Sequence, residues 1–407
     1  MHILLVADGR SPTTITYLKT LFSMGYQVSL ISTFPCEAPQ GLKHFQVLPV
    51  ALGRFAGSQA ALKTSPASTQ SQNGSPPLRK ALSKLRRAAA PIRYTAGPIS
   101  LPLYKARYLR FLAVIQPDLV HALRIPYEGM LASFTPSAIP LIVSTWGNDL
   151  TLHARGSRLM QSWTRKTLLR ANGLVSDTQR DTRLAAEWGF SADKPSLVIP
   201  GSGGLDLAAI DQAVESGVTV PVRAKQAAQL VVNPRGFRPG SVRNDTFFAA
   251  IPLLLERLPE TLFVCFAMQG QPEALEWVER LGIQNQVLLL PYLPQQAAWS
   301  IFHSAQVTVS ISQHDGTPNS LLEAMACGCF PIAGDIESLR EWIEPGQNGL
   351  LVDPSSPREL ADALEKALND DALRSQAARM NRRIVEQRAS RGVIQAQLSR
   401  FYSRFAR

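Results

Sequence analysis

The sequence lacks the cysteine pattern of a disulfide-stapled or zinc-binding protein. It has four cysteines in 407 residues, at Cys36, Cys265, Cys327 and Cys329. None of the spacings between them matches a set of metal ligands, and Cys327 and Cys329 are too close in sequence to pair easily. A small number of cysteines without a pairing pattern fits a reducing cytoplasm. We therefore expect a cytoplasmic protein with no structural metal.

Long apolar runs are also missing. The N-terminal run Ile3 to Ala7 is interrupted at once by Asp8 and Gly9, which is too short for a signal peptide. The uncharged stretch from Gly129 to Asn148 is broken by prolines and hydroxyl side chains. The sequence therefore predicts neither an export signal nor a membrane-spanning helix.

Acidic residues are absent from one long segment. Residues 38–117 contain twelve of the 42 Lys and Arg residues and no Asp or Glu, whereas elsewhere 30 basic residues face 31 acidic ones. Residues 78–110 interleave nine of these cations with leucines and tyrosines, which favours an anionic membrane surface or an anionic acceptor. The alternative is a solvated basic face. No nucleic-acid-binding motif accompanies the charge, so nucleic acid is not expected as a partner.

What the chain does contain is a strand, a polar turn and a helix between residues 307 and 328. The β-branched run Val307 to Ser312 predicts a buried strand, and Cys327-Gly328 predicts the end of the helix. Pro318 suits the first helical position, Thr317 or Ser320 can cap the helix, and Ser320 with Glu323 matches a capping box. The turn thus lies at the carboxyl end of a strand and the amino end of a helix.

Such a turn is where open α/β sheets bind ligands and where helix amides attract phosphate. Asp315 stays in the turn, whereas Glu323 lies more than one helical turn further on. The two carboxylates can therefore contact different parts of one elongated ligand. In the alternative interpretation, both acidic residues only cap backbone groups.

The beginning of the chain predicts a second unit of the same type. A strand at Ile3 to Ala7, a helix ending near Met24 and a strand at Val28 to Ile31 form a Rossmann-like start. The Gly-x-Gly-x-x-Gly fingerprint is absent, so a bound dinucleotide is not favoured. Gly9 either approaches a ligand phosphate or simply makes a tight turn. Residues Leu52 to Pro77 predict a loop rich in Ser, Ala, Gln and Gly.

The segment Asp315-Gly316-Thr317-Pro318-Asn319-Ser320-Leu321-Leu322-Glu323-Ala324-Met325-Ala326-Cys327-Gly328 resembles the donor-binding signature of family 4 retaining glycosyltransferases, also called glycosyl transferases group 1. The resemblance implies that Glu323 binds the ribose hydroxyls of a nucleotide sugar. It implies that the amides near Asn319 to Leu321 meet the diphosphate and that Asp315 faces the sugar. Many relatives carry Glu where this chain has Asp315, which is one methylene shorter.

Two N-terminal motifs resemble the same family. Pro117-Asp118-Leu119-Val120-His121 is similar to a Pro-Asp-h-h-His turn, where h is apolar, and the resemblance implies that His121 points into a catalytic cleft. Thr145-Trp146-Gly147-Asn148-Asp149 is similar to the Trp-Gly-Ser-Asp loop of relatives, with Asn148 in place of Ser. The resemblance places Trp146, Gly147, Asn148 and Asp149 on the acceptor side, and we assign Gly9 to the same side from its place after the first strand. A satisfied structural histidine is the alternative for His121.

Relatives place two basic residues on the donor diphosphate. Arg235 follows the predicted strand at residues 230–233 and matches the first of them, and Arg243 matches the second, with Arg238 as a competitor. Two arginines at a helix terminus can stabilise a departing diphosphate without a metal. The sequence contains no Asp-x-Asp pair, and we expect no metal and no cofactor besides the nucleotide-sugar substrate.

The resemblance covers most of the chain and implies an α/β protein of the GT-B fold, with two Rossmann-like domains facing across a cleft. Residues 1–203 would form the acceptor domain, residues 204–385 the nucleotide-sugar domain, and a helix at about 386–407 would pack back on the first. The implied activity is retaining transfer of a sugar to a carbohydrate or lipid-linked acceptor in cell-surface polysaccharide or glycolipid synthesis. The enzyme would be cytoplasmic, or peripheral on the inner face of the plasma membrane. Alternatives are a sugar-nucleotide epimerase of the same fold and a catalytically silent protein that docks on membranes.

Overall fold

The computed structural model describes residues 1–50, 76–216 and 220–405, and for residues 76–92 it describes the backbone alone. Most of the loop expected at Leu52 to Pro77 thus lies outside the described residues. Two compact units make up the chain. Unit 1 comprises Met1–Gly204 and Arg391–Arg407, and unit 2 comprises Leu205–Ser390. The chain passes between units at residues 204/205 and 390/391, where the sequence predicted 203/204 and 385/386.

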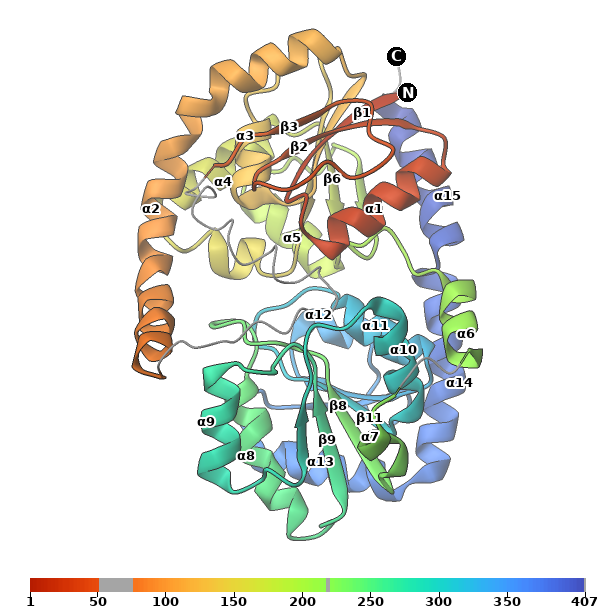
Figure 1. Ribbon diagram of the computed structural model, residues 1–407. Helices are drawn as coiled ribbons and strands as arrows, with labels where there is room; N and C mark the ends of the chain where they lie inside the picture. The colour runs from red at the N-terminus through yellow and green to blue at the C-terminus, as the bar shows by residue number, and fades with distance from the viewer. Residues whose placement is uncertain (51–75, 217–219, 406–407) are drawn as a thin grey trace. The chain divides into compact units, whose positions relative to one another are not determined.

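Unit 1 is built on a seven-stranded parallel sheet with the order β3-β2-β1-β4-β5-β6-β7 (Figure 1). Its strands are β1 (His2–Ala7), β2 (Gln27–Ser32), β3 (Phe45–Val47), β4 (Leu119–Ala122), β5 (Leu141–Thr145), β6 (Gly173–Ser176) and β7 (Ser196–Val198). Its helices are α1 (Pro12–Ser23), α2 (Pro76–Ile115), α3 (Met130–Ala132), α4 (Arg158–Arg170), α5 (Gln179–Glu187) and α15 (Arg391–Tyr402), with short helical turns η3 (Ile125–Gly129), η4 (Asp149–His153) and η5 (Ser403–Phe405).

Strand β1 shows why this sheet is covered on both faces. All six of its residues are buried, because successive side chains point to opposite faces and each face carries helices. Leu4 and Val6 belong to one hydrophobic cluster, which α2 and α4 complete. Ile3 and Leu5 belong to the opposite cluster, which α1 and α15 complete. The chain thus returns to unit 1 at its C-terminal helix in order to cover this second face.

Unit 2 contains a six-stranded parallel sheet with the order β10-β9-β8-β11-β12-β13 (Figure 1). Its strands are β8 (Gln229–Asn233), β9 (Thr261–Cys265), β10 (Val287–Leu289), β11 (Val307–Ser310), β12 (Phe330–Gly334) and β13 (Leu350–Val352). Its helices are α6 (Leu207–Glu215), α7 (Val222–Gln226), α8 (Asn244–Leu255), α9 (Pro272–Leu281), α10 (Gln295–Ser304), α11 (Asn319–Ala326), α12 (Glu337–Arg340), α13 (Pro357–Asn369) and α14 (Asp371–Arg388). Two hydrophobic clusters lie on the two faces of this sheet as well.

Each sheet has one point where the strand order reverses direction. In unit 1 this point lies between β1 and β4, and in unit 2 it lies between β8 and β11. The helices that follow neighbouring strands there leave on opposite faces, so the carboxyl ends of the two strands are left open to a ligand. The predicted site residues are therefore sought at these two edges.

Two separate parallel α/β sheets confirm the predicted fold class. Within the described part of the chain, no helix combines the length and the apolar character that crossing a membrane requires.

Candidate functional site

The reversal point of the unit 2 sheet brings Arg235 and Asp315 together. Arg235 follows β8 and Asp315 follows β11, and these strands are neighbours in the sheet. The Arg235 Nη2 atom lies 2.5 Å from Asp315 Oδ2, with side chains 6% and 17% exposed. Two positions 80 residues apart in sequence thus form one largely buried ion pair at the edge where α/β sheets bind ligands.

Neighbouring polar groups fix both members of this pair. The Arg235 amide donates to Asn233 Oδ1 over 2.9 Å. Ser312 Oγ donates to Asp315 Oδ2 over 3.0 Å, and the Gly316 amide donates to Asp315 Oδ1 over 3.1 Å. Both carboxylate oxygens of Asp315 are therefore already engaged, and the residue positions Arg235. Sequence reasoning missed Asn233 and Ser312, although both lie within three residues of a predicted site residue.

One hydrogen-bond donor of the Arg235 guanidinium is not used within the described residues. Its Nε atom is buried and has no hydrogen-bond partner among the described residues of the chain. A buried donor without a partner costs about 1–3 kcal/mol, so the arrangement favours an acceptor group at this edge.

Arg243 stands at the start of α8 beside the same edge. Its amide donates to the Ile311 carbonyl over 2.9 Å, which ties it to the end of β11. Its guanidinium donates to Asp245 from Nε to Oδ1 at 2.9 Å, from Nε to Oδ2 at 3.2 Å and from Nη2 to Oδ2 at 2.8 Å. The hydrogen bonds that Arg243 donates to Asp245 raise the pKa of Arg243 and lower the pKa of Asp245. The competing residue, Arg238, is exposed.

Helix α11 begins differently from the expectation. It starts at Asn319, with Pro318 in the capping position, and no side chain caps it. The prediction that Thr317 or Ser320 caps the helix was wrong. Thr317 Oγ1 instead accepts a hydrogen bond from Trp342 Nε1 over 2.9 Å. An uncapped helix start at a ligand-binding edge is suited to an anion, since its first amides carry partial positive charge.

Not all of the predicted amides are available at this helix start. The Leu321 amide donates to the Pro318 carbonyl over 3.0 Å, and the Leu321 side chain is buried in the core. The Gly316 amide is bonded to Asp315. Asn319 and Ser320, the first two residues of the helix, are half-buried.

Glu323 lies one turn further along α11 and takes no part in capping. Its Oε1 atom accepts a hydrogen bond from Gln295 Nε2 over 2.6 Å, at the first residue of α10. Burial raises the pKa of Glu323 to about 7, against the opposing effect of the Gln295 bond. The capping-box interpretation of Ser320 and Glu323 was wrong, and the carboxylate is held beside a neighbouring helix. Sequence reasoning missed Gln295, which lies 28 residues away.

In unit 1, His121 is buried and bonded in a way that does not fit its predicted catalytic role. Its side chain is fully buried in β4, with Nδ1 2.7 Å from Tyr402 Oη and Nε2 2.8 Å from Ser144 Oγ. Burial lowers the pKa of His121 to about 3, so the ring is neutral near physiological pH. Both ring nitrogens are used inside the unit, and the expected orientation toward a ligand was wrong.

Gly9 serves close packing. A Cβ atom at this position would lie 2.6 Å from Cys36 Sγ, so only glycine fits without a shift of its neighbours. Its amide donates to Ser32 Oγ over 3.1 Å. The tight-turn interpretation of Gly9 therefore fits the structure better than direct approach of its amide to a ligand.

The loop Trp146-Gly147-Asn148-Asp149 is anchored by its last residue. Asp149 is fully buried, and burial raises its pKa, while Arg124 opposes this shift. Its carboxylate accepts bonds from Arg124 Nη2 at 2.6 Å, the Ile125 amide at 3.0 Å and the Trp146 amide at 3.2 Å. Asp149 thus shapes the loop and does not face a ligand.

The other residues of this loop differ in their exposure. The Gly147 amide and carbonyl are bonded to Asp177 and Arg180. Trp146 and Asn148 remain half-buried, and Arg124 lies 5.2 Å from the centre of a Trp146 ring. Of the four predicted acceptor-side residues in the loop, Trp146 and Asn148 are therefore the two whose side chains a ligand can meet.

In residues 1–50, 76–216 and 220–405, no group of three or more His, Cys, Asp or Glu side chains is arranged to hold a metal ion.

Comparisons with known proteins match this chain to sugar-transferring enzymes. Residues 243–384 match the family described as "Glycosyl transferases group 1". The "D-inositol 3-phosphate glycosyltransferase" of Xylanimonas cellulosilytica is 28% identical over 216 residues, which is 51% of each chain. The matched region thus spans about half the length of that relative.

Two solved structures resemble the whole chain. Anabaena Alr3699/HepE in complex with UDP-glucose superposes with a TM-score of 0.67 at 17% identity, covering 99% of this chain and 100% of that one. An α,α-trehalose-phosphate synthase from Burkholderia vietnamiensis gives 0.71 at 14% identity, with coverages of 99% and 100%. At these identities the likeness shows a shared two-domain fold of the GT-B type.

Proposed function

We propose that this chain, whose residues 243–384 match the group 1 glycosyl transferase family, is an enzyme that transfers a sugar from a nucleotide-sugar donor to a carbohydrate or lipid-linked acceptor. The observation that carries the proposal is the arrangement at the edge of unit 2. There the Arg235 and Asp315 pair, Arg243 and the uncapped start of α11 lie beside the ends of β8 and β11, and Glu323 lies one turn further along α11.

Each part of this edge suits one part of a nucleotide sugar. The amino end of α11 and the two arginines suit the diphosphate, because helix dipole and guanidinium groups both favour anionic oxygens. Glu323, one turn along α11, suits the ribose hydroxyls, which a carboxylate can accept. Asp315 orients Arg235 through their ion pair. The UDP-glucose complex of the Anabaena structural neighbour supports a donor of this class.

Transfer requires that the bond between the sugar and the diphosphate break with both electrons leaving on the diphosphate oxygen. Negative charge therefore grows there as the reaction proceeds, and groups aimed at that oxygen lower the barrier. Arg235 and Arg243 would supply this stabilisation in place of a metal ion. We infer that the acceptor oxygen forms its bond on the face that the diphosphate leaves and gives its proton to the departing diphosphate oxygen, so that the configuration is retained.

A thermal-shift screen of nucleotide sugars tests the donor assignment. A ligand at a hundred times its dissociation constant adds about 2.7 kcal/mol to the free energy of unfolding, which raises the melting temperature measurably. At least one nucleotide sugar should stabilise the wild type and should stabilise Glu323→Gln less. A set of nucleotide sugars and nucleoside diphosphates that leaves the melting temperature unchanged would remove the basis of the proposal.

We also propose that the enzyme attaches to an anionic membrane at its cytoplasmic face and takes part in polysaccharide or glycolipid synthesis. The segment predicted for this role, residues 78–110, lies in α2. The side chains of residues 78–92, including Lys84, Arg86 and Arg87, lie outside the described residues. The described part of α2 exposes Ile99, Leu103 and Val114 by 64%, 79% and 73%.

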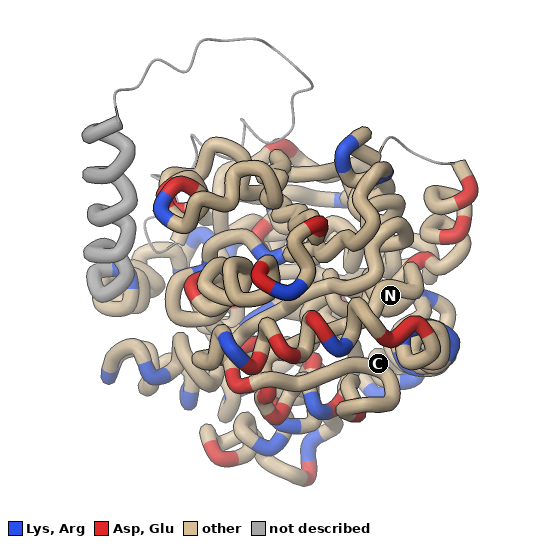
Figure 2. The backbone as a smooth tube through the Cα atoms, turned by 90° about the horizontal axis from the view of Figure 1, so that it is seen from below, with Lys and Arg blue, Asp and Glu red and all other residues tan. Residues whose placement is uncertain are grey.

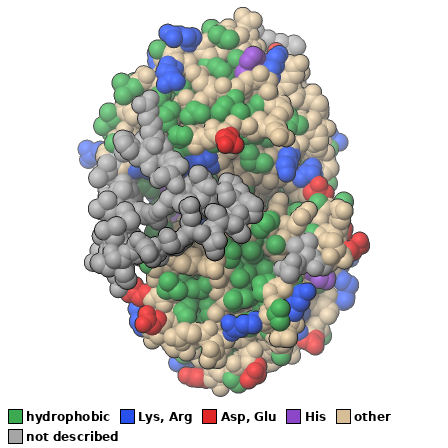
Figure 3. Space-filling model, viewed as in Figure 1, with side chains coloured by type: hydrophobic (Ala, Val, Ile, Leu, Met, Phe, Trp, Pro, Cys, Tyr) green, Lys and Arg blue, Asp and Glu red, His purple; other side chains and the backbone are tan. Residues whose placement is uncertain are grey.

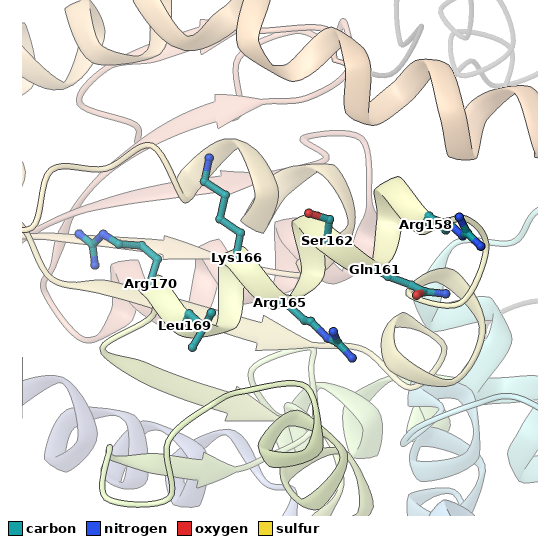
Figure 4. A pocket seen from close by; sticks show the side chains of 7 residues that line it. All are labelled: Arg158, Gln161, Ser162, Arg165, Lys166, Leu169 and Arg170. Atoms are coloured by element: carbon teal, nitrogen blue, oxygen red, sulfur yellow. The ribbon is translucent and has the colours of Figure 1, made fainter.

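Helix α4, which packs beside α2, extends the same kind of surface. Five of the eight large hydrophobic side chains that the described residues expose lie on these two helices, and neither helix contains an acidic residue. An open groove of about 640 Å³ runs along α4 and is lined by Arg158, Gln161, Ser162, Arg165, Lys166, Leu169 and Arg170. In Figure 4, Arg165 and Lys166 point to opposite sides of the helix.

Elsewhere, basic and acidic residues are interspersed along the visible backbone in Figure 2, and Figure 3 shows basic side chains as separate small groups. Exposed apolar residues among unopposed cations favour a lipid surface over a nucleic acid, since lipid accepts both.

A further inference from the structure

Three arginines converge at the reversal point of the unit 1 sheet. Arg10 follows β1, Arg124 follows β4, and Arg93 comes from α2. Arg10 and Arg93 share the ring of Phe34, with guanidinium carbons 3.8 and 5.9 Å from its centre. Like charges gathered at the carboxyl ends of parallel strands repel one another, so the arrangement favours an anion at this edge.

The turn after β4 fixes the position of Arg93. Tyr127 has φ +68° and ψ −50°, a conformation that is strained for a residue other than glycine. Its hydroxyl donates to the Arg93 carbonyl over 2.9 Å, and its ring centre lies 4.9 Å from the Arg93 guanidinium carbon. The strained turn thus holds the middle of α2 and places one cation over an aromatic face.

The carboxylates nearby do not neutralise all three cations. Asp8 pairs with Arg10 at 3.0 Å, and Asp149 pairs with Arg124 at 2.6 Å. Arg93 is exposed, and within the described part of the chain no carboxylate lies at ion-pair distance from it. One positive charge therefore remains without a fixed counter-charge.

A third carboxyl group, Glu128, is only a partial counter-charge. Its side chain is 3% exposed and accepts a bond from Thr33 Oγ1 over 3.0 Å. Burial raises the pKa of Glu128 to about 7, so it is substantially protonated near neutral pH. In addition, Glu128 Oε2 and Arg124 Nε are buried and have no hydrogen-bond partner in the residues that the structure describes. The edge thus has spare hydrogen-bonding capacity as well as spare positive charge.

We propose that this edge of unit 1 binds a phosphate group on the acceptor, so that the acceptor is a phosphorylated sugar or polyol. This inference rests on the proposed glycosyl transfer, and it adds the chemical class of the acceptor. Arg93 meets the phosphate, because the planar guanidinium fork matches its oxygens, and Arg10, whose Nε and Nη2 atoms are held by Asp8, adds positive charge beside it. The half-buried Trp146, beside Arg124, offers an aromatic surface to the sugar or polyol ring. The phosphate belongs either to a free metabolite or to a lipid headgroup.

Matched pairs of small molecules test the inference by calorimetry. The pairs are myo-inositol 3-phosphate with myo-inositol and glucose 6-phosphate with glucose, each titrated into the full chain with UDP present to occupy the donor site. A second arm compares phosphatidylcholine vesicles that contain phosphatidylinositol with vesicles that contain an equal amount of phosphatidylserine, because the two lipids carry the same net charge and Arg93 also lies in the segment proposed to bind anionic membranes. We expect at least one phosphorylated probe to bind about tenfold or more tightly than its unphosphorylated partner, as expected for a charge-assisted contact.

The variant Arg93→Ala should abolish that preference. Arg280→Ala is the matched control, because Arg280 is also an exposed arginine stacked on an aromatic ring, 4.0 Å from the centre of Trp277 in unit 2. Loss of the preference with free phosphates points to a soluble acceptor, and loss with vesicles alone points to a headgroup. The inference is overturned if no phosphorylated probe in either arm binds better than its partner, or if Arg93→Ala keeps the preference.

The donor assay separates this inference from the proposed function. If nucleotide sugars bind and turn over but the phosphate preference is absent or survives in Arg93→Ala, the acceptor inference alone is wrong. If no nucleotide sugar binds, the proposed function fails, whatever the phosphate titrations show. Melting temperatures of the variants serve as the folding control, and Arg93→Lys keeps the charge while removing the fork.

Discussion

Arg235 Nη2 lies 2.5 Å from Asp315 Oδ2, and the two residues follow the adjacent parallel strands β8 and β11. The strand order of unit 2 reverses between these two strands, so the pair occupies the edge where ligands of open α/β sheets bind. Asp315 and Asn233 fix the arginine before any donor arrives. A charge that is already oriented stabilises a leaving group without further reorganisation.

Replacing Arg235 should therefore affect turnover more than donor affinity. We expect Arg235→Ala to lower kcat roughly hundredfold, the usual effect of removing one preorganised donor from a charged transition state. The donor Kd should change less, because charge on the diphosphate grows toward the transition state. Steady-state kinetics and calorimetry measure the two effects.

Arg257→Ala is the control for this experiment, since Arg257 is ion-paired with Asp362 and lies outside the site. A rise in KM with unchanged kcat in Arg235→Ala would show that Arg235 only binds the donor.

We expect the charged form of Glu323 to lower the stability of the ligand-free protein while serving donor binding. Burial raises its pKa to about 7 in the folded state, above its ordinary value of 4.5. The unfolded chain therefore loses this proton near pH 4.5 and the folded chain only near pH 7, so the contribution of Glu323 to the free energy of unfolding falls as pH rises between these values. We expect Glu323→Gln to raise the melting temperature of the ligand-free protein more at pH 8 than at pH 5.

The same substitution should weaken donor binding by roughly 1.5–3 kcal/mol, the range for a hydrogen bond to a charged group. Calorimetry at pH 8 with the donor found in the screen measures this loss. Unchanged donor affinity in a folded Glu323→Gln protein would contradict the ribose assignment.

His121 should be needed for stability and dispensable for chemistry. Replacing it by Leu leaves Ser144 Oγ without its hydrogen-bond partner, whereas Tyr402 keeps its bond to Tyr17; the loss costs about 1–3 kcal/mol in the free energy of unfolding. At a temperature where the variant is folded, kcat should stay within about threefold, equivalent to less than 1 kcal/mol in the barrier. Denaturant unfolding and kinetics test both points. A large loss of kcat in a folded His121→Leu protein would contradict this and indicate that His121 takes part in the reaction.

The errors at His121 and at the start of α11 have a common physical cause. Tyr402, which bonds His121, lies 281 residues later, and Trp342, which bonds Thr317, lies 25 residues later. Local patterns predict which groups can cap or catalyse, but long-range partners decide which groups are already satisfied. The strand, turn and helix around Asp315 were predictable because their signals are local.

Helix α2 was harder to predict. It contains five prolines, including Pro91, Pro98 and Pro102 inside the helix, and proline ordinarily argues against helix interiors. Tyr108 and Leu112 nevertheless pack into the unit 1 core, and this burial outweighs the local preference.

Attachment to membranes should depend on the α2 surface. Replacing Lys105, Arg107 and Arg110 by Gln should release the protein from anionic vesicles, since each basic residue near such a surface contributes about 1 kcal/mol. Binding of the wild type should weaken with added salt, because charge is screened over about 8 Å at physiological ionic strength. Co-sedimentation measures both effects.

The control replaces Arg379 and Arg383 by Gln on α14, where basic residues line another groove. Equal binding of the α2 variant and the wild type, or no binding of the wild type at low salt, would contradict the attachment.

The central claim is turnover of a nucleotide sugar at the edge of unit 2. The direct measurement is release of nucleoside diphosphate from UDP-glucose and a panel of other nucleotide sugars, with the sugar product followed by NMR. The account predicts release and transfer with at least one donor, a product anomer of the same configuration as the donor, and a loss of activity in Arg235→Ala. It would be contradicted by binding without release, by formation of an epimer without any acceptor, or by release that Arg235→Ala leaves unchanged.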